Sequence, residues 1–209
     1  PDGKNRYSVP FPGPAQFRSR PVPLDPYALG VLLGDGCFRG ANPTLVNQEG
    51  DIIRRLRHQL PGLHLGPDGK TWRWDSAMTE EALKRLGLWG LASHEKFIPD
   101  AYQYGDVDTR ISVLRGLLDA DGSVTKPNTS LIEYSTTSPQ LRDDVTFLAR
   151  SLGAKVTVTG REGRYRKDGE YLPAKLNWRV LITPHPQHCL VSSDKHLARY
   201  RPKRKPHRN

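Results

Sequence analysis

The chain has 209 residues, enough for one large domain or for two small ones of about 90 residues that each bury a core. Its formal net charge is +10 and 36% of its residues are hydrophobic, which indicates a soluble protein whose large partner is a polyanion. Seven of the positive charges lie in the last fifteen residues. We therefore expect residues 195–209 to form a basic, solvated tail that contributes much of the charge.

Cysteine content and hydropathy exclude two classes of protein. The two cysteines are too few for a disulfide framework, which favours a reducing, intracellular location in the cytoplasm over secretion. No apolar run approaches the roughly 18 residues that a membrane span needs. The sequence therefore predicts a protein that does not enter a membrane.

The first half of the chain predicts helices and strands in alternation. Residues 1–24 are rich in Pro, Gly and Arg and are interpreted as an extended leader or linker. Asp25 and Pro26 then supply an N-cap and a first helical residue. The elements expected from there are a helix that runs through 27–36, two short strands around Asn42-Pro43, a helix near 49–60, a hairpin at 63–74 and a helix at 79–87.

The second half repeats this order after a connector that ends near residue 105. The patterns predict a helix at 108–121, strands within 123–138, a helix at 138–152, and strands within 155–165 and 173–183. The final hairpin is longer than its counterpart by roughly twenty residues. The domain division expected is therefore a first unit at 25–105, a second at 106–194 and the tail at 195–209.

A nine-residue motif ends the first helix of each half. ALGVLLGDG at 28–36 aligns with LRGLLDADG at 114–122, so that each copy has small residues four apart and a final Asp-Gly. A carboxylate at a helix C-terminus faces the negative end of the helix dipole, which costs a few tenths of a kcal/mol or more. An Asp-Gly that occurs once is usually only a helix stop, but two aligned copies favour a functional role.

The small residues predict how the two motif helices meet. Gly30, Gly34, Gly116 and Ala120 would let the helix backbones approach closely, which would bring Asp35 and Asp121 side by side. Two close carboxylates stay ionised only beside a positive charge, and a hard cation such as Mg²⁺ suits them. Such a site can activate water and stabilise the leaving oxygen of a phosphodiester, so hydrolysis of nucleic acid follows as a hypothesis.

The motif is very similar to the signature of the LAGLIDADG, or dodecapeptide, homing endonucleases. The stretches SHEKFIPDAYQYGDVDTRISVLRGLLDADGSV and EYSTTSPQLRDD resemble the endonuclease domains found in inteins, and the resemblance covers most of 25–182. It implies an α+β fold of two pseudo-symmetric αββαββα units, with motif helices at the interface and a β-sheet saddle that binds DNA. It further implies a monomer that cuts both strands of a long DNA site and leaves short 3′ overhangs.

The resemblance also assigns roles to individual residues. Asp35 and Asp121 would be the catalytic metal ligands for Mg²⁺, with Mn²⁺ as an alternative, assisted by the carbonyls of Gly34 and Ala120. The first motif has Leu33 where the second has Asp119, so Asp119 is expected to be structural. Lysines near each scissile phosphate in the family match Lys70 and Lys175. The candidates for DNA contacts on the sheets are Arg39, Arg73, Arg161, Arg164, Arg166, Lys167 and Arg179.

The sequence is also compatible with two alternatives to an active nuclease. Some proteins of this family have lost cleavage and act as RNA maturases or DNA-binding regulators, and Leu33 and the shorter first hairpin are compatible with a weakened enzyme. A merely structural domain of a larger precursor would not bind DNA tightly. Protein splicing is not expected, because Pro1 is not a nucleophile and the chain ends in His-Arg-Asn rather than His-Asn.

Overall fold

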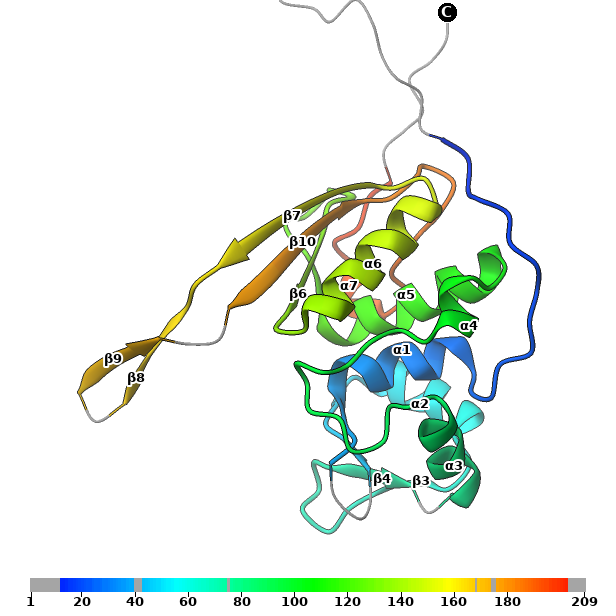
Figure 1. Ribbon diagram of the computed structural model, residues 1–209, viewed down its shortest axis with the longest axis vertical. Helices are drawn as coiled ribbons and strands as arrows, with labels where there is room; N and C mark the ends of the chain where they lie inside the picture. The colour runs from blue at the N-terminus through cyan, green and yellow to red at the C-terminus, as the bar shows by residue number, and fades with distance from the viewer. Residues whose placement is uncertain (1–11, 40–42, 75, 168, 174–175, 203–209) are drawn as a thin grey trace, which may run out of the picture.

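The motif helices form the centre of the molecule. The computed structural model describes residues 12–39, 43–74, 76–167, 169–173 and 176–202. Helix α1, Pro26–Asp35, begins at Asp25, whose carboxylate accepts a hydrogen bond from the Ala28 N–H at 3.0 Å. Helix α5, Val107–Asp121, begins in the same way at Asp106. The two helices lie side by side between the two halves of the chain (Figure 1).

Each half builds an αββαββα unit around its motif helix, which confirms the expected α+β class and its duplication. The first unit continues from α1 through β1 Gly36–Cys37, β2 Thr44–Leu45, α2 Gly50–Gln59, β3 Leu63–Leu65, β4 Trp72–Trp74 and α3 Ala77–Arg85. The second continues from α5 through β5 Gly122–Val124, β6 Ile132–Thr136, α6 Pro139–Ser151, β7 Lys155–Arg161, β8 Arg164–Lys167, β9 Glu170–Pro173, β10 Asn177–Thr183 and α7 Asp194–Leu197.

The two antiparallel sheets have the same strand order. Strands run β1-β2-β4-β3 in the first and β5-β6-β10-β7 in the second, and the latter is extended by the separate β8–β9 ladder. In the second sheet, Val156 and Val158 of β7 and Val180 and Ile182 of β10 point inward. The alternate residues of these strands form the opposite face. The repeat seen in the sequence is therefore also a repeat of topology.

Three features of the fold were not expected from the sequence. The connector contains a short helix, α4 Asp100–Gln103, and the long second hairpin divides into two ladders. The predicted solvated tail is wrong at its start, because Lys195 lies in α7 and His196 and Tyr200 are buried. Helices of four residues have too few turns to show periodicity, and a run of charges does not reveal which of its members pack against the body.

The leader also packs against the body where the structure describes it. From residue 12 to residue 24 it runs in an extended conformation beside the second unit (Figure 1). The Ala15 N–H donates to the Ser151 carbonyl at 2.8 Å, and the buried Arg110 guanidinium donates to the Ala15 carbonyl. Leu24 is buried, and its carbonyl accepts a hydrogen bond from the Tyr102 hydroxyl at 2.9 Å.

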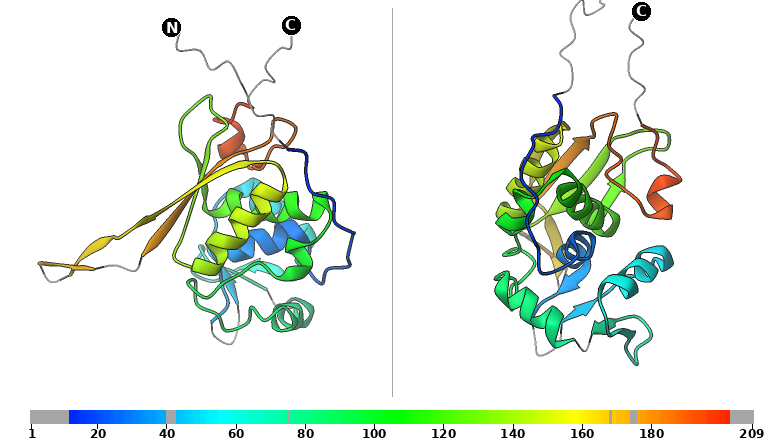
Figure 2. Two further views of the ribbon diagram at one scale, coloured as in Figure 1. Left: turned by 45° about the horizontal axis from the view of Figure 1, so that its top comes forward. Right: turned by 90° about the vertical axis from the view of Figure 1, so that its right-hand side faces the viewer.

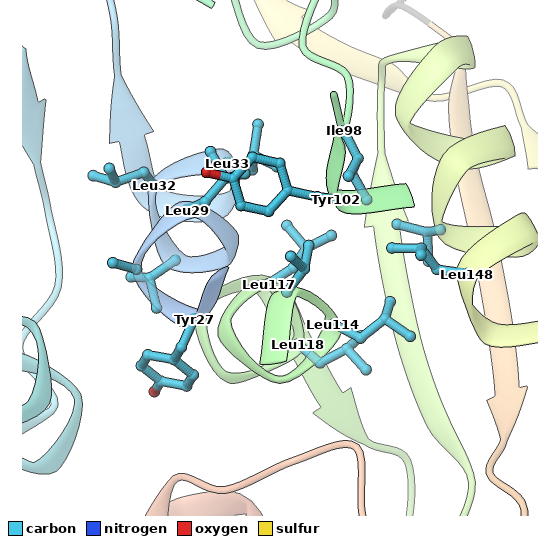
Figure 3. Close-up of a cluster of buried hydrophobic side chains, with 14 of the residues drawn as sticks. Tyr27, Leu29, Leu32, Leu33, Ile98, Tyr102, Leu114, Leu117, Leu118 and Leu148 are labelled. Carbon is cyan, nitrogen blue, oxygen red and sulfur yellow. The ribbon is translucent and has the colours of Figure 1, made fainter. Parts of the chain in front are cut away.

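Close backbone contact between α1 and α5 depends on the small residues of the motif. A Cβ added at Gly30 would lie 2.2 Å from the Val113 carbonyl oxygen, and one added at Gly116 would lie 2.0 Å from the Tyr27 carbonyl oxygen. Leucines of both helices fill the space around the seam (Figure 3). The predicted seam is confirmed. Among the described residues, each helix is too short or too polar to cross a bilayer.

Substitution at the seam tests this packing. We expect Gly30→Ala to lower the free energy of unfolding by about 2 kcal/mol or more, because its methyl group would overlap backbone atoms of α5. Gly50→Ala is the matched control, since a Cβ there meets nothing within 4 Å and alanine favours the helix. Thermal and urea unfolding measure both variants. Equal stability of the two variants would show that the seam is not tightly packed.

Candidate active site

The seam brings the last carboxylate of each motif to the same place. Asp35 ends α1 and Asp121 ends α5. A Cβ added at Gly34 would lie 2.7 Å from the Ala120 Cβ and 3.4 Å from Asp121 Oδ2. The two acids, 86 positions apart in sequence, are therefore neighbours, as the repeat predicted.

Burial raises the pKa of both carboxyl groups, and the charge of Asp35 raises that of Asp121 further. The pKa of Asp121 is raised to about 6, first because surrounding protein desolvates the carboxylate and second because of the charge of Asp35. Its side chain still opens onto solvent. Burial also raises the pKa of Asp35, although a 2.6 Å hydrogen bond from Asn47 Nδ2 favours the ionised form. A cation bound close to the two carboxylates would therefore stabilise the ionised form of both.

Lys96 is a buried cation close to these carboxylates, and only 3% of its surface is exposed. Its ammonium group donates to the carbonyls of Leu33 at 2.8 Å and Gly36 at 2.6 Å, with longer contacts to Leu32 and Gly34. These carbonyls belong to the C-terminal turn of α1 and to the residue that follows it. Lys96 therefore places a positive charge at the negative end of the α1 dipole, where Asp35 lies. This charge offsets the unfavourable interaction between the Asp35 carboxylate and the dipole.

The surroundings of Lys96 fix its position. Its own carbonyl accepts a hydrogen bond from Ser138 Oγ at 2.7 Å, and its ammonium lies 4.9 Å from the centre of the Phe38 ring. Burial lowers its pKa to about 8, while the charges of Asp121 and Asp35 oppose that change. Lys96 is thus a buried cation that faces both carboxylates and that remains largely protonated near neutral pH.

A second lysine reaches the site from the far end of the chain. The charge of Lys195 in α7 lowers the pKa of both Asp35 and Asp121, and its ammonium lies 3.4 Å from Glu49 Oε1. The Asp194 N–H, next to it, donates to Asp51 Oδ2 of α2 at 2.9 Å. The C-terminal segment that contains Asp194 and Lys195 therefore connects the two units close to the carboxylates.

Asp119 anchors this segment. Its carboxylate is fully buried and accepts hydrogen bonds from the N–H groups of Ser192 and Ser193, at 2.8 and 3.0 Å. The Ser192 hydroxyl donates at 2.6 Å and the Tyr27 hydroxyl at 3.1 Å. The expected structural role of Asp119 is confirmed. Leu33, at the same motif position in the first unit, is instead packed in the core.

Two cavities open beside Lys96. One, of ≈ 200 Å³, is lined by Gly34, Asp121, Tyr134, Thr136 and Asn177 among others. The next, of ≈ 350 Å³, is lined by Cys37, Arg39, Ser93, His94 and Thr137. Lys96 lines both cavities. A polar pocket that includes the cations Lys96 and Arg39 thus continues outward from the carboxylates, which suits an extended anionic ligand better than a small apolar one.

Comparison with known proteins identifies the motif. Residues 108–203 match the family model of the LAGLIDADG-like domain. The chain is 37% identical over 75 residues to the homothallic switching endonuclease of Saccharomyces cerevisiae. Residues 108–203, which carry the second motif, are therefore a LAGLIDADG-like domain.

Other similarities are broader in coverage but lower in identity. The replicative DNA helicase DnaB of Mycobacterium intracellulare is 28% identical over 155 residues, or 74% of this chain. The chain spans only 23% of the length of that relative and 13% of the yeast endonuclease. Among solved structures, mesophilic variants of the homing endonuclease I-DmoI give a TM-score of 0.48 at 12% identity, over 77% of this chain and 88% of that one. That structural overlap is too slight to carry an inference.

The other residues expected at a LAGLIDADG site lie in several places. Lys70 follows Gly69 in the exposed turn between β3 and β4, where its N–H donates to Asp68 Oδ1 at 3.1 Å. In the part of the chain that the structure describes, the lysines whose charges lower the pKa of both carboxyl groups are Lys96 and Lys195. Lys175 lies outside the described residues. The catalytic roles suggested for Lys70 and Lys175 therefore stay predictions.

The basic residues expected to contact DNA are spread over both sheets. Arg73 and Arg161 are exposed on β4 and β7, and Arg39 follows β1 beside the larger cavity. Arg179 on β10 is paired with Glu133 of β6, so any contact with a base would involve this pair. Strand β8 carries Arg164, Arg166 and Lys167. Their contacts with DNA stay predictions.

A divalent cation fits the donor set at the LAGLIDADG carboxylates. Within the described residues, no group of three or more His, Cys, Asp or Glu side chains could enclose a metal. An ion at this site would depend on Asp35 and Asp121, with carbonyl, water and substrate oxygens completing its shell. Mg²⁺ commonly binds in this way, through one or two carboxylates and a phosphate. The Gly34 carbonyl is already 3.5 Å from the Lys96 ammonium, so Ala120 is the less engaged of the two carbonyl candidates.

Sequence reasoning missed three residues of this site. Lys96 lies in the connector, where a lone lysine before Phe97, Ile98 and Pro99 was the available signal of a buried charge. Lys195 was grouped with the basic tail. Asn47 follows a strand too short to establish a register. Each of these three reaches the carboxylates only through tertiary contacts.

Proposed function

We propose that this LAGLIDADG chain is a site-specific endonuclease that cuts both strands of duplex DNA with the help of a divalent cation. The observation that carries the proposal is the pairing of Asp35 and Asp121, one from each repeat, beside two lysines and an open polar cavity. The name of the yeast relative, an endonuclease, agrees with this chemistry. A pseudo-twofold pair of carboxylates suits a duplex, whose two strands are related by the same symmetry.

The proposed roles follow from where the groups lie. Asp35 and Asp121 would hold Mg²⁺, or Mn²⁺, with the Gly34 and Ala120 carbonyls in support. A cation bound there would supply an activated water and would stabilise the leaving oxygen of the phosphodiester. Because the pKa of Asp121 is raised to about 6, this carboxyl is largely ionised at pH 7, and a cation would displace its proton chiefly at pH 6 and below.

Lys96 and Lys195 would stabilise the charge that develops on the phosphate. Lys96 is preorganised, because carbonyls of the first motif hold its ammonium in place before any substrate arrives. Fixed cations in a partly desolvated site stabilise a transition state without reorganisation at the moment of reaction. Lys195 would contribute from the other side, held by the Asp119 anchor.

Finer features of the reaction belong to the same proposal. The chain carries both carboxylates, so a single copy would suffice and a monomer is expected. Cleavage across the pseudo-twofold axis would leave short 3′ overhangs, and a DNA substrate implies action inside the cell.

Loss of either carboxylate tests the proposal. We expect Asp35→Asn and Asp121→Asn each to reduce double-strand cutting at least ~100-fold while DNA binding persists, because each removes a metal ligand. Asp108→Asn, an exposed acid at the opposite end of α5, should cut like the wild type. The substrate is a plasmid library with randomised inserts, incubated with Mg²⁺ or with Mn²⁺, and the cut ends are sequenced.

The result also separates the proposal from its main alternative. Binding of selected inserts by the wild-type protein without cutting in either metal would favour a DNA-binding regulator. Cutting that persists in both asparagine variants would show that hydrolysis occurs elsewhere. If the wild-type protein neither binds nor cuts DNA, the result would favour a domain with a purely structural role.

A second set of variants measures how much each lysine contributes to the rate of cutting. Lys96→Met and Lys195→Met should each slow cutting about 100-fold, whereas Lys70→Met should have little effect if the cations beside the carboxylates are the ones that act. Single-turnover cutting measures the rates. Thermal unfolding and DNA affinity are measured in parallel, because Lys96 also caps α1. A large loss in Lys70→Met with normal rates in Lys195→Met would reverse this ranking.

A further inference from the structure

The two units present ribbons of very different length. In the first sheet, β3 and β4 have three residues each. In the second, β7 and β10 have seven each, and β8 and β9 extend the same hairpin by four more on each side. We call β7, β8, β9 and β10 the arm. Figures 1 and 2 show that the arm projects well beyond the body of the molecule, with no counterpart in the first unit.

The arm is braced where it leaves the body. The Trp178 ring packs over Gly160 of the facing strand, at which a Cβ would lie 3.1 Å from the ring. The Arg142 guanidinium of α6 stacks on the same ring, 4.1 Å from its centre, and is itself paired with Asp143. Cation and ring in this geometry attract each other. The direction of the arm is therefore set by packing against α6 before any ligand binds.

The open face of the arm has the chemistry of a nucleic-acid contact. On β7, the residues that point away from α6 are Lys155, Thr157, Thr159 and Arg161, and each of them is exposed. Register places Asn177 beside Arg161 and Arg179 beside Thr159. Hydroxyl, amide and guanidinium groups on a two-stranded ribbon can contact phosphates and base edges in the major groove. Strand β8 adds the sequence RYRK toward the tip.

We infer that the arm makes the DNA footprint asymmetric, with a longer half-site on the side of the second unit. The inference rests on the proposed function, since it extends the same DNA complex outward from the carboxylates. At ~3.3 Å per residue, the four-residue β8–β9 ladder spans about 13 Å, which is the axial length of about four base pairs. The first unit has no strands of comparable reach in the described part of the chain.

Shortening the arm tests the inference. Arg161 and Asn177 are the last paired residues of the β7–β10 ladder, so an Asn-Gly turn in place of residues 162–176 should close a shorter hairpin. A second variant, Arg164→Gln with Arg166→Gln and Lys167→Gln, keeps the length and removes charge. The control is Arg73→Gln, which removes an exposed cation from the first sheet.

Hydroxyl-radical footprints on a duplex selected from the randomised library give the readout, supported by trimming that duplex from each end. The wild type should protect about four more base pairs on one side of the cut position. The shortened arm should lose that excess only, without moving the cut. The charge variant should keep the extent but show a weaker dependence of affinity on salt, since fewer phosphates are neutralised. Arg73→Gln should leave the long side intact.

Each other outcome overturns the inference in a distinct way. A symmetric wild-type footprint, or an asymmetric one that the shortened arm leaves unchanged, rejects the role of the arm while DNA cutting stands. A shortened arm that loses cutting but retains the full footprint assigns the arm to another task. Failure of the wild type to bind any duplex rejects the proposed function together with the inference, and is seen before the variants are compared.

Discussion

Close contact between the backbones of α1 and α5 is the constraint on which the rest of the structure depends. Gly30 and Gly116 face each other so tightly that a methyl group on either would overlap a backbone atom of the opposite helix. This contact sets the distance between the two units and so the distance between Asp35 and Asp121. Tight packing between two helix backbones therefore determines where the two carboxylates lie.

The charges around the seam resolve a conflict that this placement creates. Two acids at the negative ends of two helices repel each other, and the charge of Asp35 adds to the effect of burial in raising the pKa of Asp121. Lys96 offsets part of this cost at α1, and Lys195 approaches both acids from the C-terminal segment. The remaining deficit of positive charge is what makes a divalent cation and an anionic substrate complementary to the site.

Much of the fold followed from local patterns, because the motif is duplicated and each copy has clear caps. Asp25 and Asp106 mark the helix starts, and small residues four apart predicted the seam. The lysines could not be found in this way. Lys96 is meaningful only because the connector folds back onto α1, and Lys195 only because Asp119 holds residues 192 and 193. Such contacts between distant segments leave no periodic trace in a sequence.

The central claim is that Asp35 and Asp121 form one electrostatically coupled site. Carbon-detected NMR titration of the Asp121 carboxyl, in the metal-free protein with and without Asp35→Asn, tests it most directly. The account predicts a pKa of about 6 in the wild type and a clearly lower value in the variant, because the charge of Asp35 is removed. An Asp121 pKa that does not change between the two proteins would contradict it.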